Sequence, residues 1–185
     1  MKLQEAFATS IVVAARAPDA AMQRGFTIVE LMITVLVGAI LAIIAVPSLL
    51  DTLNNMRQSS ALGLLINDMN QARGEAIKRN GNVLICGRNS NGTDCAAVTD
   101  WRVGWVVCIE GSIVDKCAGA ALNPNPNAVI VRPPLDAVLT LTTSVDPIRF
   151  RANSGGTAAT LTLGGTWSAA TRTVAVAATG SISKQ

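Results

Sequence analysis

The chain has 185 residues, half of them apolar, and a formal net charge of +3. A charge this small does not by itself indicate nucleic-acid binding. The chain has no histidine, which excludes Ser-His-Asp and Cys-His catalysis and every metal site that requires imidazole. Neither a paired-carboxylate motif nor a phosphate-binding loop stands out, so we expect no catalytic residues, no cofactor and no enzyme activity.

Residues 26–46 form an almost uninterrupted apolar run, FTIVELMITVLVGAILAIIAV, in which Glu30 is the only charged residue. A helix of this length spans roughly 30 Å, the thickness of the hydrocarbon core of a bilayer. Arg24 precedes the run, and a basic residue there keeps that end of a membrane helix in the cytoplasm. The sequence therefore predicts a single-pass helix, with everything after Pro47 outside the inner membrane.

Glu30 requires an explanation, because an acidic residue costs about 2.5–3.5 kcal/mol in the middle of a membrane helix and usually marks a function. Cleavage after Gly25 gives Phe26 a free α-amine, which lies four residues from Glu30 on one helix face. The carboxylate can pair with this amine or with that of a neighbouring subunit, and such a pair fixes the axial register of packed helices. A secretory signal peptide has a shorter apolar region, and a simple signal anchor leaves Glu30 unexplained.

Segment 25–31, GFTIVEL, resembles the processing site of type IV prepilins and type II secretion pseudopilins. The resemblance implies that a prepilin peptidase cleaves between Gly25 and Phe26 and then N-methylates Phe26. Glu30 becomes the fifth residue of the mature chain, where this family has its assembly glutamate. The leader of residues 1–25 is longer than the short basic leaders of many relatives, and Met22 is an alternative start.

Residues 48–80 continue with helical periodicity. Pro47 is expected to kink or locally open the long helix rather than end it, and Asn80-Gly81 is a suitable stop. Apolar residues three or four apart predict one stripe that packs on the sheet of a globular domain. The stripe consists of Leu49, Leu53, Met56, Leu62, Leu65, Ile66, Met69, Ala76 and Ile77.

From residue 81 onwards, short strand-like segments alternate with turns rich in Asn, Pro and Gly. Strands are expected at 83–85, 104–109, 128–131, 139–142, 148–150, 159–163 and 173–176. One long helix followed by such strands predicts an α+β fold with an antiparallel sheet or two small sheets. The chain accordingly divides into a leader (1–25), a transmembrane helix (26–47), an amphipathic helix (48–80) and a periplasmic β-rich domain (81–185).

Segment 70–80, NQARGEAIKRN, and segment 101–107, WRVGWVV, resemble the GspH/FimT group of minor pilins and pseudopilins. With the N-terminus, the resemblance covers most of residues 22–180 and implies a pilin-like fold and a structural role in a filament. It also implies other pilins or pseudopilins, prepilin peptidase and an inner-membrane assembly platform as partners. A minor subunit near the tip of a type IV pilus and a type II secretion pseudopilin both remain open; the two segments favour the pilus.

The four cysteines fall into two C-x8-C units, Cys86/Cys95 and Cys108/Cys117. An even number after an export-type segment indicates disulfides formed in an oxidising compartment. Three connectivities are open, and we expect the local pairing within each unit. A zinc site is the alternative, but the spacing is not the C-x2-C of common zinc sites.

Nucleic-acid binding is a further hypothesis, because some FimT-like proteins carry a basic Gly-Arg-x-Arg tail. In the matching stretch of this chain, which begins at Gly180, both arginine positions are serine, and this reduces the charge that can neutralise phosphates. The cationic residues that would have to gather on one surface for this function are Arg149, Arg151, Arg172 and Lys184.

Overall fold

The computed structural model describes residues 25–166 and 168–185. In these residues one long helix, α1 (Ile28–Arg79), is followed by eight strands. The strands are β1 (Val83–Gly87), β2 (Trp105–Ile109), β3 (Ala128–Val131), β4 (Leu139–Thr143), β5 (Ile148–Phe150), β6 (Ala159–Gly165), β7 (Ser168–Val176) and β8 (Ile182–Lys184). The expected α+β class and all seven expected strands are confirmed. Strand β8 was not anticipated, because serines flank its single large apolar residue.

Helix α1 runs through Pro47 without ending, as expected. Proline has no N–H to donate to the carbonyl of Ile43, so this one helical hydrogen bond is missing. The chain divides into two compact units, the first ending at Ile43 and the second beginning at Ile44. At its C-terminal end, the N–H of Asn80 donates to the carbonyl of Ile77 and the N–H of Gly81 to that of Ala76. With Asn80 at a φ of 49°, these bonds form a Schellman motif, so the predicted helix stop is confirmed.

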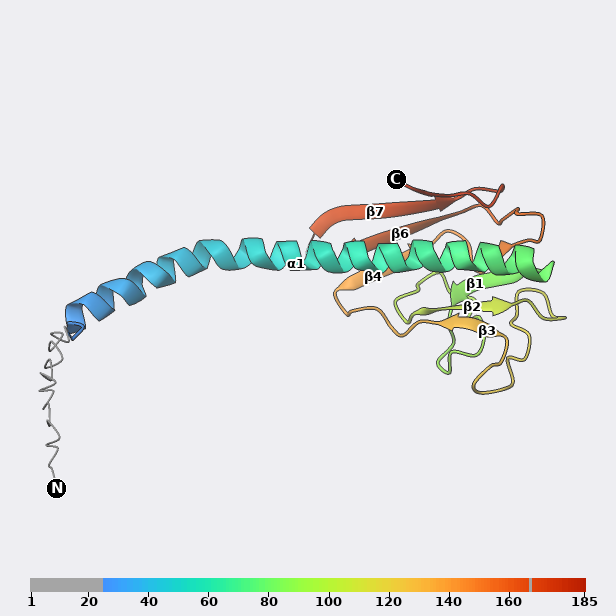
Figure 1. Cartoon of the computed structure of the whole chain (residues 1–185), viewed down its shortest axis with the longest axis horizontal. Helices are drawn as coiled ribbons and strands as arrows, with labels where there is room; N and C mark the ends of the chain where they lie inside the picture. Colours follow the sequence, from blue (N-terminus) through green and yellow to red (C-terminus); the bar gives the residue numbers. More distant parts are fainter. Residues whose placement is uncertain (1–24, 167) are drawn as a thin grey trace, which may run out of the picture. The chain divides into compact units, whose positions relative to one another are not determined.

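The second unit contains two antiparallel sheets of four strands, in the orders β3-β2-β1-β5 and β4-β6-β7-β8. Figure 1 shows strands of both sheets beside the teal-to-green half of α1. Apolar side chains of this half of the helix and of both sheets form one buried cluster. Its largest members include Leu65, Met69, Ile85, Trp101, Trp105, Leu141, Ile148, Phe150, Leu161 and Leu163.

The predicted apolar stripe of α1 is only partly buried. Leu62, Leu65, Met69 and Ala76 are buried, and Ile66 is half-buried against the same cluster. The prediction is wrong for Leu49, Leu53, Met56 and Ile77, which are 42–60% exposed. The buried residues of α1 run from Gln58 to Ala76, so the sheets cover the helix over that stretch alone.

Asp68 fastens α1 to the first sheet from a completely buried position. Its carboxylate accepts hydrogen bonds from the indole N–H of Trp105 at 2.9 Å and from the guanidinium of Arg132 at 2.8 and 2.7 Å. The Asp68 charge is therefore both paired and hydrogen-bonded, as a buried carboxylate has to be. The same interaction raises the pKa of Arg132.

Gln58 fastens α1 to the second sheet in a different way. Its amide Nε2 donates to the carbonyl of Leu163 on β6 at 3.0 Å and to that of Ala170 on β7 at 3.2 Å. These carbonyls lie where the β6–β7 ladder shifts register between Leu163 and Gly165. Gln58 therefore bonds α1 to both strands of this hairpin next to the irregularity.

The face of the first sheet that points away from α1 is covered by two disulfide-closed loops. Cys86 is bonded to Cys95 and Cys108 to Cys117, with S–S distances of 2.03 and 2.06 Å. All four cysteines are buried in a second apolar cluster with Leu84 and Val106, which alternate along β1 and β2 with residues of the main cluster. The Asp94 carboxylate joins the two loops by accepting from the backbone N–H groups of Cys95 and Cys117.

Replacing Asp68 by asparagine should lower the free energy of unfolding by roughly 3 kcal/mol, because Arg132 then loses its anion in a partly buried place. Urea unfolding of the full chain in detergent, followed by tryptophan fluorescence, measures the change. Asp136→Asn is the matched control, since Asp136 pairs with Arg57 at 3.5 Å in an exposed position. Equal effects of the two substitutions would contradict the role assigned to Asp68.

Removing either disulfide by a double Cys→Ala replacement should lower the free energy of unfolding by about 2.5–3 kcal/mol, from loop closure alone. The two pairs control for each other, because both have a sequence separation of 9. Thermal unfolding of Cys86→Ala/Cys95→Ala and Cys108→Ala/Cys117→Ala, compared with the unaltered chain, tests this. An unchanged melting temperature in both variants would show that the loops fold without their bridges.

Candidate functional site

Gly25 and Phe26 lie just before the first turn of α1, in backbone that is neither helix nor strand. Both are exposed, and the side chain of Phe26 is 73% accessible. A peptide bond in exposed, irregular backbone can enter the active site of a protease. The rest of the predicted leader, including Met22, falls outside the described residues, which begin at Gly25.

Thr27 caps the first turn of α1, and Glu30 occupies the third helical position. The hydroxyl oxygen of Thr27 accepts the backbone N–H of Glu30 at 3.1 Å. Thr27-Ile28-Val29-Glu30 has the T-x-x-E form of a capping box, and an acid in the first turn is favoured by the helix dipole. Thr27 was not singled out by the sequence analysis, although the T-x-x-E pattern identifies it. Glu30 is exposed, so its charge is available to a group on another chain.

Helix α1 is long and apolar enough to cross a membrane, by its length and composition. An 18-residue window near its N-terminus has a mean hydropathy of 2.7, and none of that window is buried within the described chain. Among the described residues up to Pro47, Glu30 is the one charged side chain. So long an exposed apolar surface is typical of a segment that a bilayer or other apolar helices cover.

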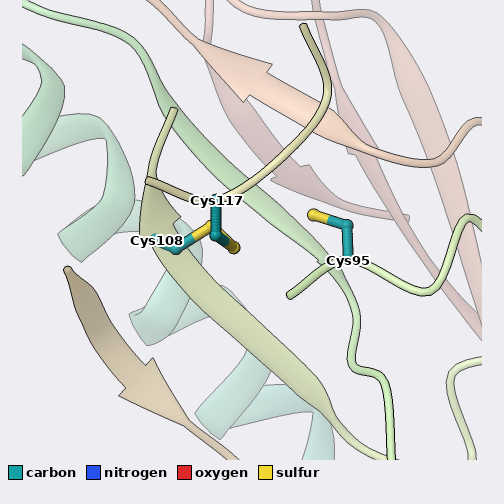
Figure 2. Close-up of side chains that lie close together, drawn as sticks. All are labelled: Cys95, Cys108 and Cys117. Carbon is teal, nitrogen blue, oxygen red and sulfur yellow. A yellow bond between two sulfur atoms is a disulfide. The ribbon is translucent and has the colours of Figure 1, made fainter. Parts of the chain in front are cut away.

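The four cysteines form disulfides in the local pairing. Figure 2 shows the Cys108–Cys117 bond beside Cys95, whose sulfur points toward it. The sulfurs of Cys95, Cys108 and Cys117 lie within 4.8 Å of one another, close enough to suggest a metal site. All three are bonded in disulfides, however, and a metal needs thiolates as ligands. Their closeness follows from the stacking of two bridges on one face of the sheet.

Arg149 and Arg151 lie at the β5 end of the first sheet, and the charge of Arg149 is neutralised there. Its guanidinium donates to Glu110 at 2.9 and 2.5 Å and to Asp115 at 2.7 Å. This contact raises the pKa of Arg149, and the hydrogen bonds from Arg149 lower the pKa of Glu110. Arg151 donates to the carbonyl of Gly156 at 3.3 Å.

Arg172 and Lys184 lie on β7 and β8 of the second sheet. Arg172 donates to the hydroxyl of Ser59 on α1 at 2.8 Å, and Lys184 is exposed. The four cations are thus divided between two sheets. Arg149, the most strongly engaged of them, would have to give up two carboxylates before it could bind a phosphate.

Comparison with known families gives two matches. The family described as Type II transport protein GspH matches residues 61–180, and the prokaryotic N-terminal methylation motif matches residues 21–46. Together they cover the segment around Gly25 and Glu30, α1 from Ala61 onwards and strands β1 to β7. A search of curated proteins returns no match.

Two crystal structures of the type IV minor pilin FimU of Pseudomonas aeruginosa have a similar fold. The form in space group P21 is 17% identical, with a TM-score of 0.54 over 71% of this chain and 90% of FimU. The form in space group P65 is also 17% identical, with a TM-score of 0.50 over 69% of this chain and 91% of FimU. At this identity the likeness concerns the fold. Because the GspH family matches more than half of the sequence, this chain belongs to the GspH family of pilin-like proteins.

Proposed function

We propose that this chain is a minor structural subunit of a type IV pilus, made as a prepilin and cleaved between Gly25 and Phe26. The observation that carries the proposal is the arrangement at the start of α1. An exposed, irregular peptide bond is followed at once by a capped helix with a single acid, Glu30, in a bilayer-length apolar run. Its role is assembly rather than catalysis, as in pilins and pseudopilins generally.

Cleavage creates a positively charged α-amine on Phe26, which the Glu30 carboxylate can pair with. The new α-amine of Phe26 stands one residue before the Thr27 cap, at the positive end of the helix dipole, where a cation is disfavoured. A carboxylate near that amine offsets the repulsion, and in a dry bundle of helices the attraction is stronger than in water. Pairing of the amine with the Glu30 carboxylate of an adjacent subunit therefore fixes the register in which the two helices pack. N-methylation of Phe26 leaves the amine positively charged.

The proposed route begins in the inner membrane. Residues 26–47 cross the bilayer once, with the leader in the cytoplasm, and residues 81–185 fold in the periplasm, where the two disulfides form. After cleavage by prepilin peptidase, the assembly platform moves the apolar helix from the bilayer into the filament. The transfer exchanges one apolar environment for another, so it has little hydrophobic cost.

A type II secretion pseudopilin is the second candidate, and the description of the matching family, Type II transport protein GspH, favours it. Both candidates share the cleavage, the membrane helix and the assembly step. They differ in which filament holds the chain. Detection of the tagged protein in sheared surface pili supports the pilus, whereas copurification with a secretion platform and absence from pili supports the pseudopilus.

Coexpression with a prepilin peptidase should yield a mature chain that begins with N-methylated Phe26, because Gly25-Phe26 is accessible and followed by the capped helix. Mass spectrometry of the N-terminal peptide measures this, with a strain lacking the peptidase as control. A mature N-terminus at any other residue, or an uncleaved chain in filaments, would exclude the proposed maturation.

Glu30→Ala should leave membrane insertion and cleavage intact but reduce the amount of the protein in sheared filaments at least tenfold. The expected loss reflects an unpaired amine in an apolar bundle, which costs several kcal/mol. Asp51→Ala, at another exposed acid of α1, is the matched control and should enter filaments normally. Normal incorporation of Glu30→Ala would remove the register role from this residue.

A further inference from the structure

An apolar groove of about 460 Å³ opens between α1 and the segment that follows β3. One wall is the helix face with Leu53, Met56 and Leu64, and the other consists mainly of Pro133, Leu135 and Leu139. The three helix residues are 42%, 60% and 46% exposed, and Leu49, a further helical turn toward the N-terminus, is 59% exposed. Leu49, Leu53 and Met56 belong to the stripe that was predicted to pack on the domain, and Leu64 was not part of it. Within the described part of the chain, this face of the helix therefore stays largely exposed.

The wall opposite the helix is held in place by the fold. Arg132 donates its backbone N–H to the carbonyl of Trp105, and Leu135 donates to that of Arg102, both at 2.9 Å. Gly104, with a φ of 92°, allows the close approach, because a Cβ there would collide with the carbonyl oxygens of Arg132 and Pro133. The groove is therefore formed before anything binds, which lowers the entropic cost of binding.

The charges at the groove are already paired. Arg132 is bound to the buried Asp68, and Arg57 spans the groove to Asp136 at 3.5 Å. An occupant consequently needs no charge of its own to match them. A helix suits such a site, because its backbone hydrogen bonds are satisfied internally and it presents only side chains to the apolar walls.

We propose that this groove receives the apolar N-terminal helix of a neighbouring filament subunit, of the kind that residues 28–46 form in this chain. The inference rests on the proposed function and names a partner surface for it. The chain carries two unpartnered apolar surfaces, one convex and one concave. The convex surface is the helix, in which an 18-residue window has a mean hydropathy of 2.7 and no buried residue. The concave surface is the groove, which has apolar walls and paired charges.

The symmetry of the contact agrees with a filament. Helix and groove are different surfaces of one chain, so the contact is heterologous: each subunit offers a helix to one neighbour and a groove to another. Contacts of this type continue from subunit to subunit instead of closing as a two-fold dimer. The groove also places the contact on the folded domain, in addition to helix packing in the filament axis.

Photo-crosslinking in detergent tests the contact without requiring filaments. The full chain carries benzoylphenylalanine at position 64 in the groove or, as control, at position 114, where Val114 is 70% exposed in the loop after β2. The probe is an isotopically heavy synthetic peptide of residues 26–47. We expect a heavy crosslink from position 64 that Met56→Lys reduces at least tenfold, and little from position 114. Equal crosslinking at both positions, or crosslinking unaffected by Met56→Lys, would overturn the proposal.

Filament incorporation separates this proposal from the proposed function. Met56→Lys should fold with an unchanged melting temperature, because Met56 is exposed, and yet enter filaments at least tenfold less than Val114→Lys. If the peptide crosslinks at position 64 but the unaltered chain never enters a filament, the groove assignment stands and the proposed function fails. If the unaltered chain and Met56→Lys enter filaments equally, the groove assignment fails and the proposed function stands.

Discussion

The architecture depends on how one helix is shared by two sheets. Most of the buried residues of α1 are apolar, but apolar contacts are not directional and would tolerate sliding of the helix. Two buried polar side chains prevent that sliding: Asp68 binds Trp105 and Arg132 on one side, and Gln58 binds the carbonyls of Leu163 and Ala170 on the other. A shift of one turn would break these bonds and leave the buried Asp68 carboxylate without its partners.

The position at which the sheets are held on α1 also determines which part of the helix stays exposed. The sheets cover α1 from Gln58 to Ala76, and the apolar residues before that stretch remain exposed. Under the proposed function, this apolar surface lies in the membrane first and later packs against the helices of other subunits. The groove beside Met56 lies where covered and uncovered parts of the helix meet, and its far wall is anchored through Arg132 to the same Asp68.

In the part of the chain that the structure describes, the face of the first sheet opposite α1 is buried by loops and not by a helix. No further helix covers this face in the described residues; two disulfide-closed loops do, and their cystines form the small cluster around Leu84 and Val106. Around these loops the charges pair locally, as in Arg149 with Glu110 and Asp115 and in Lys116 with Asp94. These ion pairs tie the loops to one another and to β5.

The sequence by itself determined most of what depends on neighbouring residues, with strand β8 as an exception. Hydropathy over one segment predicts the apolar span, and Asn80-Gly81 predicts the helix stop, since each signal is local. The T-x-x-E pattern at Thr27 is equally local, but it was not used to predict the helix start. Only the tertiary structure decided that Asp68 meets Arg132 and that Gln58 meets a bulge between β6 and β7. It also decided which part of the predicted stripe stays exposed. These contacts join residues more than sixty positions apart, and helical periodicity shows which face is apolar but not how far along that face the sheets extend.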